Sequence, residues 1–474
     1  MTVQLSRWRS TRSWRERTGE SLPSFEEAKV VTTYGVEDDS TRVQWTPAFA
    51  LFLLYIFCII TYRLNVGTAA MVGSIACLPL QRDRIVFPKL LVALGLLTLW
   101  CAFGFSRSVA PDVTWEAVML MGKLWLVTFV GVNVLRSRSQ IRFFILFSLG
   151  WFAAYPIRGA LKNYYVDQYA LAGRAIWNYI YNNPNDLAAI CLLELAVTLA
   201  FLQRAKGWPK IPAFVGVALL PFVVILTQSR GALIALGVFC IAGLAMHRRN
   251  LRVMATVIVI AVVAVMLAPA DVWDRMSGLG RATSVSGLNQ VDTEGSARQR
   301  FEIWRVASTI AAEEPIFGVG SGAYPIVHQI VAQRPQFDRT AAGARDAHST
   351  YLVALAETGI PGLILFLAVF VVTVWETDRV RRQCRKTLPR TSLEIAYLEL
   401  GLLALFIAGI WGSYTRLTFT YLHLLLLASV AAAARKELAT TTQRVERSIF
   451  TLSIPERRRA GGAVAIAHGK LGGP

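Results

Sequence analysis

The sequence predicts an all-α polytopic membrane protein with about twelve transmembrane helices and a large, partly helical extracytoplasmic loop between helices nine and ten. The first observation is composition: 54% of the 474 residues are hydrophobic, 17% are charged, and the mean hydropathy is +0.47. Soluble domains are less apolar than this. The second observation is that the apolar residues occur in runs of about twenty, the length that crosses a bilayer core.

Twelve apolar runs are long enough, or nearly long enough, to be spans. Tight hairpins join the first run to the second and the eleventh to the twelfth. The predicted spans are 46–62, 65–80, 86–106, 113–135, 140–157, 186–203, 211–228, 231–246, 251–270, 349–376, 394–412 and 414–434.

The distribution of lysine and arginine sets the expected orientation. With the N-terminus in the cytoplasm, the inside loops carry eighteen of these residues and the short outside loops carry seven. Cytoplasmic loops carry the excess in multi-pass proteins. We therefore expect a multi-pass protein of the cytoplasmic (inner) membrane with both termini inside. Because arginines precede any apolar core in the first 44 residues, we expect no cleavable signal peptide.

The spans divide the chain into five parts. We expect the two polar tails to be largely disordered. The predicted parts are a basic cytoplasmic tail at 1–44, helices one to nine at 45–270, an extracytoplasmic loop at 271–347, helices ten to twelve at 348–434 and a cytoplasmic tail at 435–474.

Charge and cysteine usage exclude several classes of partner. Most of the net charge of +19 falls on the cytoplasmic face, which suits anionic membrane lipids. The basic residues are spread over loops without interleaved aromatics, so we expect no nucleic-acid partner. The large loop contains none of the six cysteines and the five histidines are scattered. We therefore expect no disulfide framework, no metal site and no cofactor.

The large loop contains one amphipathic helix, predicted at Ser296–Glu313. Pro315 ends the helix. Its apolar stripe is formed by Phe301, Trp304, Ala307 and Ala311 at helical spacing, widened by Ile303, Val306 and Ile310. A second short helix is predicted at 323–333. The amphipathic helix is expected either to lie against the membrane interface or to cap the bundle.

Two arginines on the predicted outer side are candidates for binding an anion. Arg230 lies in a tight outer turn, where the positive-inside bias disfavours arginine. Arg300 begins the amphipathic helix, between Arg298 and Arg305. The planar guanidinium suits phosphate oxygens, and the helix N-terminus would reinforce an anion site. The alternatives are a snorkelling residue for Arg230 and a solvated helix face for Arg300.

His348 is the candidate general base, since histidine titrates near neutral pH. It lies where the loop returns to the membrane, two residues after Asp346. A capping or packing histidine is the alternative. Glu357 follows in the same helix and is either functional or an ion-paired buried carboxylate.

Four other features have plainer interpretations. The glycines of Gly318–Gly322 follow a helix rather than a strand, so they indicate a tight turn that lets backbone approach backbone rather than a nucleotide loop. Asn185 or Asp186 can cap the sixth span. His423 is expected to be a packed core histidine. Lys123 and Glu194 could pair or line a cavity.

Taken together and in order, these residues resemble the O-antigen ligase / O-antigen polymerase superfamily. The resemblance covers about residues 170–365, and before the sixth span it is one of hydropathy alone. It is carried by Asn183-Pro184-Asn185, Ser229-Arg230-Gly231, Arg300-x-x-x-Trp304 with Pro315-x-x-Gly318-x-Gly320, and His348-x-x-Tyr351-Leu352 with Glu357-x-Gly359.

The resemblance implies glycosyl transfer on the outer face of the cytoplasmic membrane, without a metal or nucleotide sugar. The donor would be a glycan on undecaprenyl pyrophosphate, and the acceptor lipid A–core or another glycan. Arg230 and Arg300 would bind the pyrophosphate and His348 would activate the acceptor hydroxyl or assist the leaving group. The substrate-binding positions assigned around them are Arg174, Asn185, Arg298, Arg305, Tyr351 and Glu357.

Two alternatives come from other classes. A transporter or flippase for lipid-linked glycan predicts paired ionisable residues at mid-membrane, and the sequence has few of these. A structural or sensor protein leaves the outer arginines unexplained. Short motifs do not separate a ligase from a polymerase, nor identify the acceptor, the glycan, the oligomeric state or the role of the basic N-terminal tail.

Overall fold

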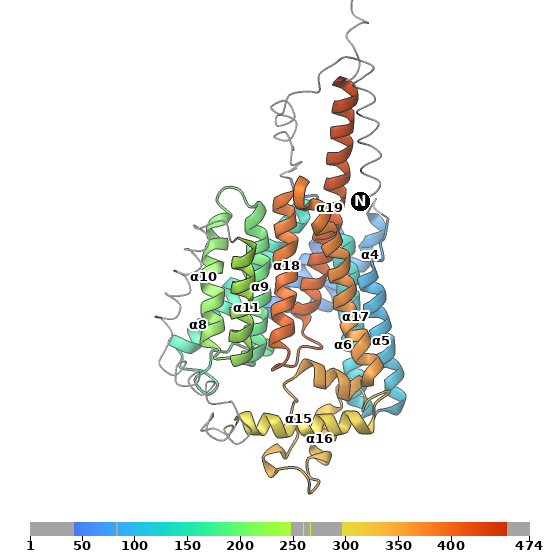
Figure 1. The fold of residues 1–474 in the computed structure, drawn as a ribbon, viewed down its shortest axis with the longest axis vertical. Coiled ribbons are helices and arrows are strands. Elements are labelled where there is room, and N and C mark those ends of the chain that lie inside the picture. Colours follow the sequence, from blue (N-terminus) through green and yellow to red (C-terminus); the bar gives the residue numbers. More distant parts are fainter. Residues whose placement is uncertain (1–41, 82–83, 248–258, 260–265, 267–295, 453–474) are drawn as a thin grey trace, which may run out of the picture. The chain divides into compact units, whose positions relative to one another are not determined.

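The computed structural model describes residues 42–81, 84–247, 259, 266 and 296–452, and every regular element in these ranges is a helix. The all-α prediction is therefore confirmed (Figure 1). Two units are distinguished, Thr41–Arg435 and the two terminal segments together; the fold below is that of Thr41–Arg435.

The described part of the chain contains seven helices that are long and apolar enough to cross a membrane. Four more apolar helices are shorter, at 10–17 residues each, so the longest of them spans about 26 Å. The seven are Lys89–Arg107 (α5 with η2), Pro111–Val134 (α6), Arg138–Tyr165 (α7, η3 and α8), Pro184–Arg204 (α9), Thr350–Thr387 (α17), Pro389–Ala408 (α18) and Thr418–Gln443 (in α19), and the four are Pro47–Thr61 (α3), Gly67–Leu80 (α4 with η1), Lys210–Leu226 (α10) and Arg230–Met246 (α11).

Eleven of the twelve predicted spans overlap one of these segments, and the ninth, at 251–270, lies outside the described residues. Two helices extend past their predicted ends. The fifth continues to Tyr165 because a π-helical turn accommodates Pro156 within it. The last helix, α19, continues to Leu452, so the predicted C-terminal tail begins with helix rather than disordered chain.

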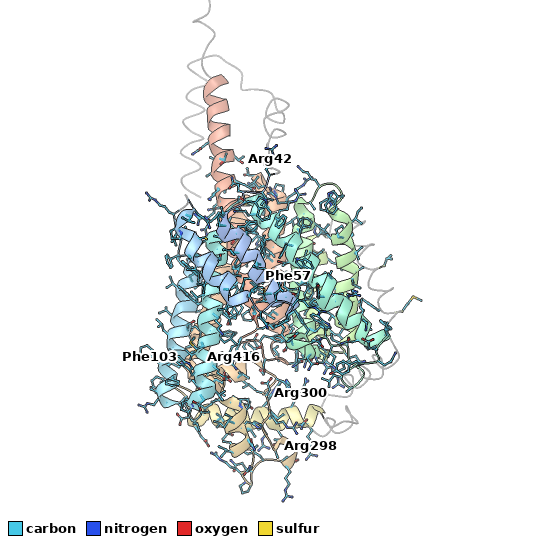
Figure 2. The ribbon with its side chains drawn as sticks, turned by 180° about the vertical axis from the view of Figure 1, so that it is seen from behind. Arg42, Phe57, Phe103, Arg298, Arg300 and Arg416 are labelled. Carbon is cyan, nitrogen blue, oxygen red and sulfur yellow. The ribbon has the colours of Figure 1, made fainter. Side chains whose placement is uncertain are left out.

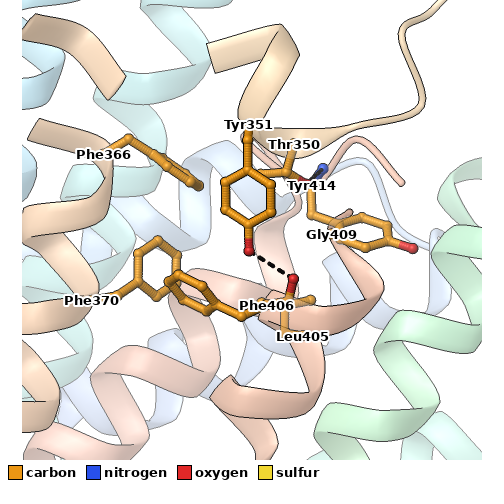
Figure 3. Close-up of a pocket in the computed structure, with 8 residues that line it drawn as sticks. All are labelled: Thr350, Tyr351, Phe366, Phe370, Leu405, Phe406, Gly409 and Tyr414. Atoms are coloured by element: carbon orange, nitrogen blue, oxygen red, sulfur yellow. Dashed lines mark hydrogen bonds between the residues drawn. The ribbon is translucent and has the colours of Figure 1, made fainter. Parts of the chain in front are cut away.

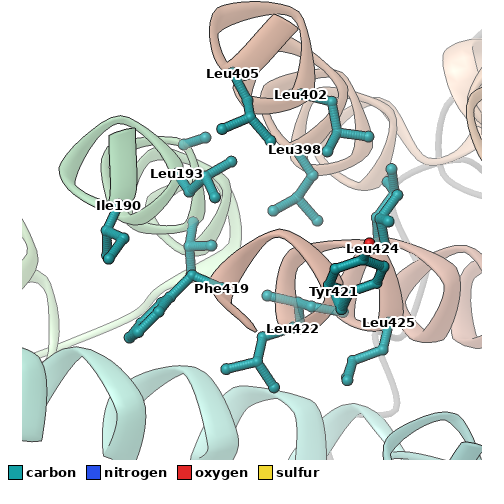
Figure 4. Close-up of a cluster of buried hydrophobic side chains, with 14 of the residues drawn as sticks. Ile190, Leu193, Leu398, Leu402, Leu405, Phe419, Tyr421, Leu422, Leu424 and Leu425 are labelled. Atoms are coloured by element: carbon teal, nitrogen blue, oxygen red, sulfur yellow. The ribbon is translucent and has the colours of Figure 1, made fainter. Parts of the chain in front are cut away.

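The helix at the centre of the bundle is α9, in which 83% of the most apolar 18-residue stretch is buried. A helix that is apolar on every side is stable only when other helices surround it, and α9 packs against α18, α10, α11 and α7. Figure 4 shows Ile190 and Leu193 of α9 beside Leu398 of α18 and Phe419 of α19. This helix also begins with Asn185, so its tight packing fixes the position of one candidate site residue.

A smaller core joins α15 (Ser296–Glu313) and α16 (Tyr324–Val331) to the start of α17 (Figure 1). The bounds of α15 agree with the predicted helix. The predicted stripe is largely confirmed: Ile303, Val306, Ala307, Ile310 and Ala311 are buried, whereas Phe301 is 41% exposed and lies outside the buried face. Because this face packs on protein, α15 caps helices of the bundle, which was one of the two predicted alternatives.

Helix α17 is broken at Gly359, and the segment of Gly318 and Gly320 pairs with the backbone at this break. Gly359 has φ +67° and ψ −174°, a region open essentially to glycine alone. The break frees backbone groups that the segment after α15 then pairs: Val319 N–H donates to the Ala356 carbonyl (2.9 Å), and Gly320 N–H to that of Glu357 (3.1 Å). Trp100 Nε1 donates to the Thr358 carbonyl (2.8 Å). The predicted close backbone approach is confirmed.

Replacing Gly359 by alanine is expected to destabilise the protein by about 3 kcal/mol, from the strained backbone and the overlap together. A Cβ at this position would lie 2.1 Å from the Ile316 carbonyl oxygen. The matched control is Gly122→Ala in α6, where an added Cβ meets nothing within 4 Å. Thermal unfolding of the detergent-solubilised variants measures both; equal unfolding temperatures would contradict this account of the break.

Candidate functional site

Five segments far apart in the sequence are joined by hydrogen bonds at one end of the bundle, which we call the α15 end. Most of these bonds run from side chains to backbone carbonyls, so they fix the course of the chain as well as the side chains. The segments are 171–175, the start of α9 at 183–186, the turn 227–230 before α11, residues 346–350 at the start of α17, and the α18–α19 connection at 409–416.

Arg174 ties two of these segments together. Its Nε donates to the Thr227 carbonyl and its Nη2 to Asn185 Oδ1, both at 2.8 Å. Asn185 is 7% exposed, and its backbone N–H donates to Oδ1 of Asn183, the N-cap of α9, at 2.9 Å. The capping alternative thus applies to Asn183, and Asn185 instead binds Arg174. The guanidinium is held in one orientation at the junction of α9 and the turn.

Arg230 begins α11 directly after that turn, in which Gln228 has φ +51°. The backbone here lies against the α18–α19 connection: a Cβ at Gly231 would be 2.9 Å from Trp411 Cβ. Because Gly231 lies this close to Trp411, the preceding residue, Arg230, lies next to the α18–α19 connection.

The α18–α19 connection is bonded to the start of α17. Thr350 Oγ1 donates to the Gly412 carbonyl at 2.7 Å, and Ser413 Oγ donates to Asp346 Oδ1 at 2.8 Å. Tyr414 is buried and its hydroxyl donates to the Asn185 carbonyl at 3.1 Å. Burial raises the pKa of Tyr414, with a further contribution from the nearby Asp186 carboxylate, so the phenol stays protonated as a donor.

His348 lies between these groups in a conformation that side chains rarely adopt, with φ +48°. Left-handed backbone at a non-glycine residue costs free energy and often accompanies functional sites. Its Nδ1 is 3.5 Å from Asp346 Oδ2. Burial lowers the pKa of His348; Asp346 opposes this, while the positive charges of Arg300, Arg174 and Arg345 lower it further. The neutral imidazole that a general base needs is thereby favoured.

Arg300 faces this site because of its phase on α15. Residues four apart lie on the same side of a helix, and Trp304 donates from Nε1 to the carbonyl of Ala347, the residue before His348, at 2.9 Å. Figure 2 shows Arg300 on the side of α15 toward the other helices and Arg298 on the opposite side. The charges of Arg300 and Arg174 act on both His348 and Tyr414, which places the two arginines at one site.

Arg298 and Arg305, assigned to substrate binding from their sequence positions, lie elsewhere on α15. Arg298 is paired with Asp338 at 2.6 Å. Arg305 is paired with Glu302 at 2.9 Å and lies over the ring of Phe337. Two residues along a helix correspond to about 200° of rotation, which separates Arg298 from the site although it adjoins Arg300 in sequence.

Tyr351 and Glu357 both lie on α17 and make contacts within the protein. The Tyr351 hydroxyl donates to the Phe406 carbonyl at 2.7 Å, within a pocket of aromatic side chains between α17 and α18 (Figure 3). Glu357, 3% exposed, is paired with Arg416 at 2.6 Å. Nothing in the sequence around Arg416 marks it as the partner of Glu357, and Ser413 and Tyr414 are indicated only as part of a tight hairpin.

Replacing Arg416 by methionine is expected to destabilise the protein by about 3–5 kcal/mol, because the Glu357 carboxylate would stay buried without its cation. Adding Glu357→Gln removes that charge, so the double variant is expected to recover most of the lost stability. Thermal unfolding of the two single variants and the double variant measures the coupling; additive effects would contradict the pair.

Among the described residues, no three histidine, cysteine, aspartate or glutamate side chains lie close enough together to hold a metal ion. The groups at the α15 end are instead arginines, a histidine, hydroxyls and carboxylates. Such a set can bind an anion and move a proton at a bundle end.

The fold and this site define a multi-pass helical membrane protein with a cationic, histidine-containing site at one end of its bundle. Residues 215–367 match the family model described as O-antigen ligase, which confirms the predicted resemblance to the O-antigen ligase / O-antigen polymerase superfamily. The matched residues include Arg230, Arg300, His348, Tyr351 and Glu357. Members of this family are glycosyltransferase-like enzymes of polysaccharide biosynthesis.

One curated relative is an uncharacterized protein of Haemophilus influenzae, 21% identical over 198 residues. The similar region covers 40% of this chain and 49% of the relative. The chain therefore spans about half the length of the relative it matches.

Proposed function

We propose that the protein is an O-antigen ligase-like glycosyltransferase that moves a glycan from undecaprenyl pyrophosphate to an acceptor hydroxyl on the outer face of the cytoplasmic membrane. The main support is the convergence of Arg174 and Arg300 on His348. A pyrophosphate leaving group needs fixed positive charge in a partly buried site, which arginines supply without a metal. The attacking hydroxyl needs a base beside that charge.

The reaction divides naturally between these residues. His348 takes the proton of the acceptor hydroxyl while its oxygen forms a bond to the anomeric carbon of the donor glycan. The bond from that carbon to the pyrophosphate oxygen breaks, and undecaprenyl pyrophosphate leaves with the electron pair. Arg300, Arg230 and Arg174 stabilise the negative charge that develops on the leaving group. The bond from the glycan to pyrophosphate is more activated than the glycosidic bond that replaces it, so the transfer needs no further energy source and no cofactor.

Asp346 has a positioning role in this proposal. With Nδ1 toward the Asp346 carboxylate at 3.5 Å, the other ring nitrogen, Nε2, is left for the acceptor proton. Ser413 Oγ donates to the other oxygen of the same carboxylate, Oδ1. Because Ser413 belongs to the α18–α19 connection, that connection helps to set the orientation of the base.

The test is transfer by the purified protein in membrane vesicles that hold a lipid-linked glycan donor, with and without acceptor. Transfer requires an acceptor and releases undecaprenyl pyrophosphate. Movement of intact donor across the vesicle without an acceptor would instead support the transporter.

The acceptor is tested in a strain that lacks the protein. Full-length glycan accumulating on undecaprenyl pyrophosphate, and missing from lipid A–core, is the result expected of a ligase. Single repeat units accumulating on the lipid would assign the same chemistry to a polymerase, with another lipid-linked unit as acceptor.

A further inference from the structure

A second polar cluster lies inside the bundle, on helices that the proposed reaction does not use for chemistry. A cavity of about 20 Å³ is lined by Ser148 of α7, Glu194 of α9 and His423 of α19, together with eight apolar residues that include Ile60 and Phe419. Glu194 is the eleventh residue of the 21 in α9, so it lies about 15 Å from either end of that helix. The cluster is at mid-bundle, away from the α15 end.

Three polar atoms of this cluster are buried without a hydrogen-bond partner among the described residues: Ser148 Oγ, Glu194 Oε2 and His423 Nδ1. Buried polar atoms are normally satisfied, because leaving one unpaired costs free energy. His423 Nε2 lies 2.8 Å from the Leu398 carbonyl. Since a carbonyl only accepts, Nε2 carries the hydrogen and Nδ1 presents a lone pair.

We propose that Ser148, Glu194 and His423 bind an internal water molecule, with Glu194 in its acid form as the proton-carrying member of the site. The cavity exceeds the roughly 10–15 Å³ that one water needs, and three partners is the usual number for a buried water. The water donates to His423 Nδ1 and exchanges its other hydrogen bonds with Glu194 and Ser148. All three orphaned atoms are then satisfied.

The charge balance around the cavity favours the acid form of Glu194. No lysine or arginine is among the lining residues, and Lys123, a sequence candidate for pairing, is exposed on α6. The other titratable groups that face Glu194 are Cys191 and Tyr181, both neutral when protonated. A buried carboxylate without a cation is strongly disfavoured, so the group keeps its proton. Burial among apolar helices thus turns Glu194 into a proton-binding site.

Infrared difference spectroscopy of the purified protein at neutral pH tests whether Glu194 carries a proton. We expect the carbonyl band of a protonated carboxyl, sensitive to deuterium oxide, to be present in the native protein and lost in Glu194→Gln. Glu313→Gln is the matched control, since Glu313 is exposed and paired with Arg334; that variant is expected to keep the band. A band that is unchanged in Glu194→Gln would overturn the proposal.

A second variant tests the shared water and does not depend on Glu194→Gln folding. Ser148→Ala removes one partner, so the carboxyl band is expected to shift in frequency. An unshifted band in Ser148→Ala would overturn the water-linked arrangement. His348→Ala, at the α15 end, is expected to leave the band unchanged whether or not the protein transfers glycans, so this test and that of the proposed function fail separately.

Discussion

Replacing Arg300 by alanine is expected to reduce glycan transfer by about 10²–10³-fold, the effect of removing one fixed donor from the site where charge develops. The side chain is held toward His348 by the buried face of α15 and by the bond from Trp304 to the Ala347 carbonyl. Arg300→Lys keeps the charge but not the planar fork, so an intermediate rate is expected. The measurement is the rate of product formation from a lipid-linked glycan donor by purified protein.

The matched control is Arg298→Ala. Both arginines lie within the first five residues of α15, and losing either changes the net charge equally, but Arg298 is on the opposite side and paired with Asp338. Transfer by this variant is expected to stay close to that of the native protein. Equal losses in both variants would show that the effect comes from the charge of α15 as a whole and would refute a specific role for Arg300.

Much of the fold could be predicted because bilayer-crossing helices leave a strong signal in hydropathy. The apolar runs in the sequence predict eleven of the apolar helical segments in the described part of the chain. The helical spacing of apolar residues, together with Pro315, predicts the bounds of α15. The edge of the buried face of α15 was harder to predict. Ile303, Val306 and Ile310 pack against protein as expected, whereas Phe301, at the edge of the predicted stripe, is exposed. Tertiary contacts decide which apolar residue at the edge of a stripe is covered, and hydrophobicity alone does not show this.

The site could be predicted only where its residues stand out from their surroundings. Arg230 and His348 are polar groups at the edges of apolar runs, so they were visible in the sequence. The backbone contacts that assemble the site were not: the carbonyls of Thr227 and Gly412 accept key hydrogen bonds whatever their side chains are. The Arg416–Glu357 pair joins residues 59 positions apart, and nothing local to either one identifies its partner.

Replacing His348 by alanine is expected to lower transfer by about 10²–10⁴-fold, the usual contribution of a general base. His348→Gln is the more informative variant, because glutamine keeps a polar side chain but takes up no proton in this pH range. A similar loss in both variants is expected. Native rates in His348→Gln at neutral pH would refute the base and leave a role in packing or capping.

The fall of transfer activity at acid pH, the acid limb of the pH profile, tests the role of His348 as a base independently of the absolute transfer rate. A base works when it is unprotonated, so activity is expected to be level at neutral pH and to fall as pH drops through the pKa of His348. Burial lowers that pKa below its ordinary value of about 6.5, so the fall begins at lower pH than for an exposed histidine.

Two neighbouring charges act on this limb with opposite sign. Asp346 raises the pKa of His348, so Asp346→Asn is expected to move the acid limb to lower pH. Arg345 lowers the pKa, so Arg345→Ala is expected to move it to higher pH, by a smaller amount because Arg345 is exposed and its charge is screened by salt. Since each substitution removes one charge beside the same imidazole, the limb is expected to move in opposite directions in the two variants. A limb that moves in neither variant would assign it to a group away from His348.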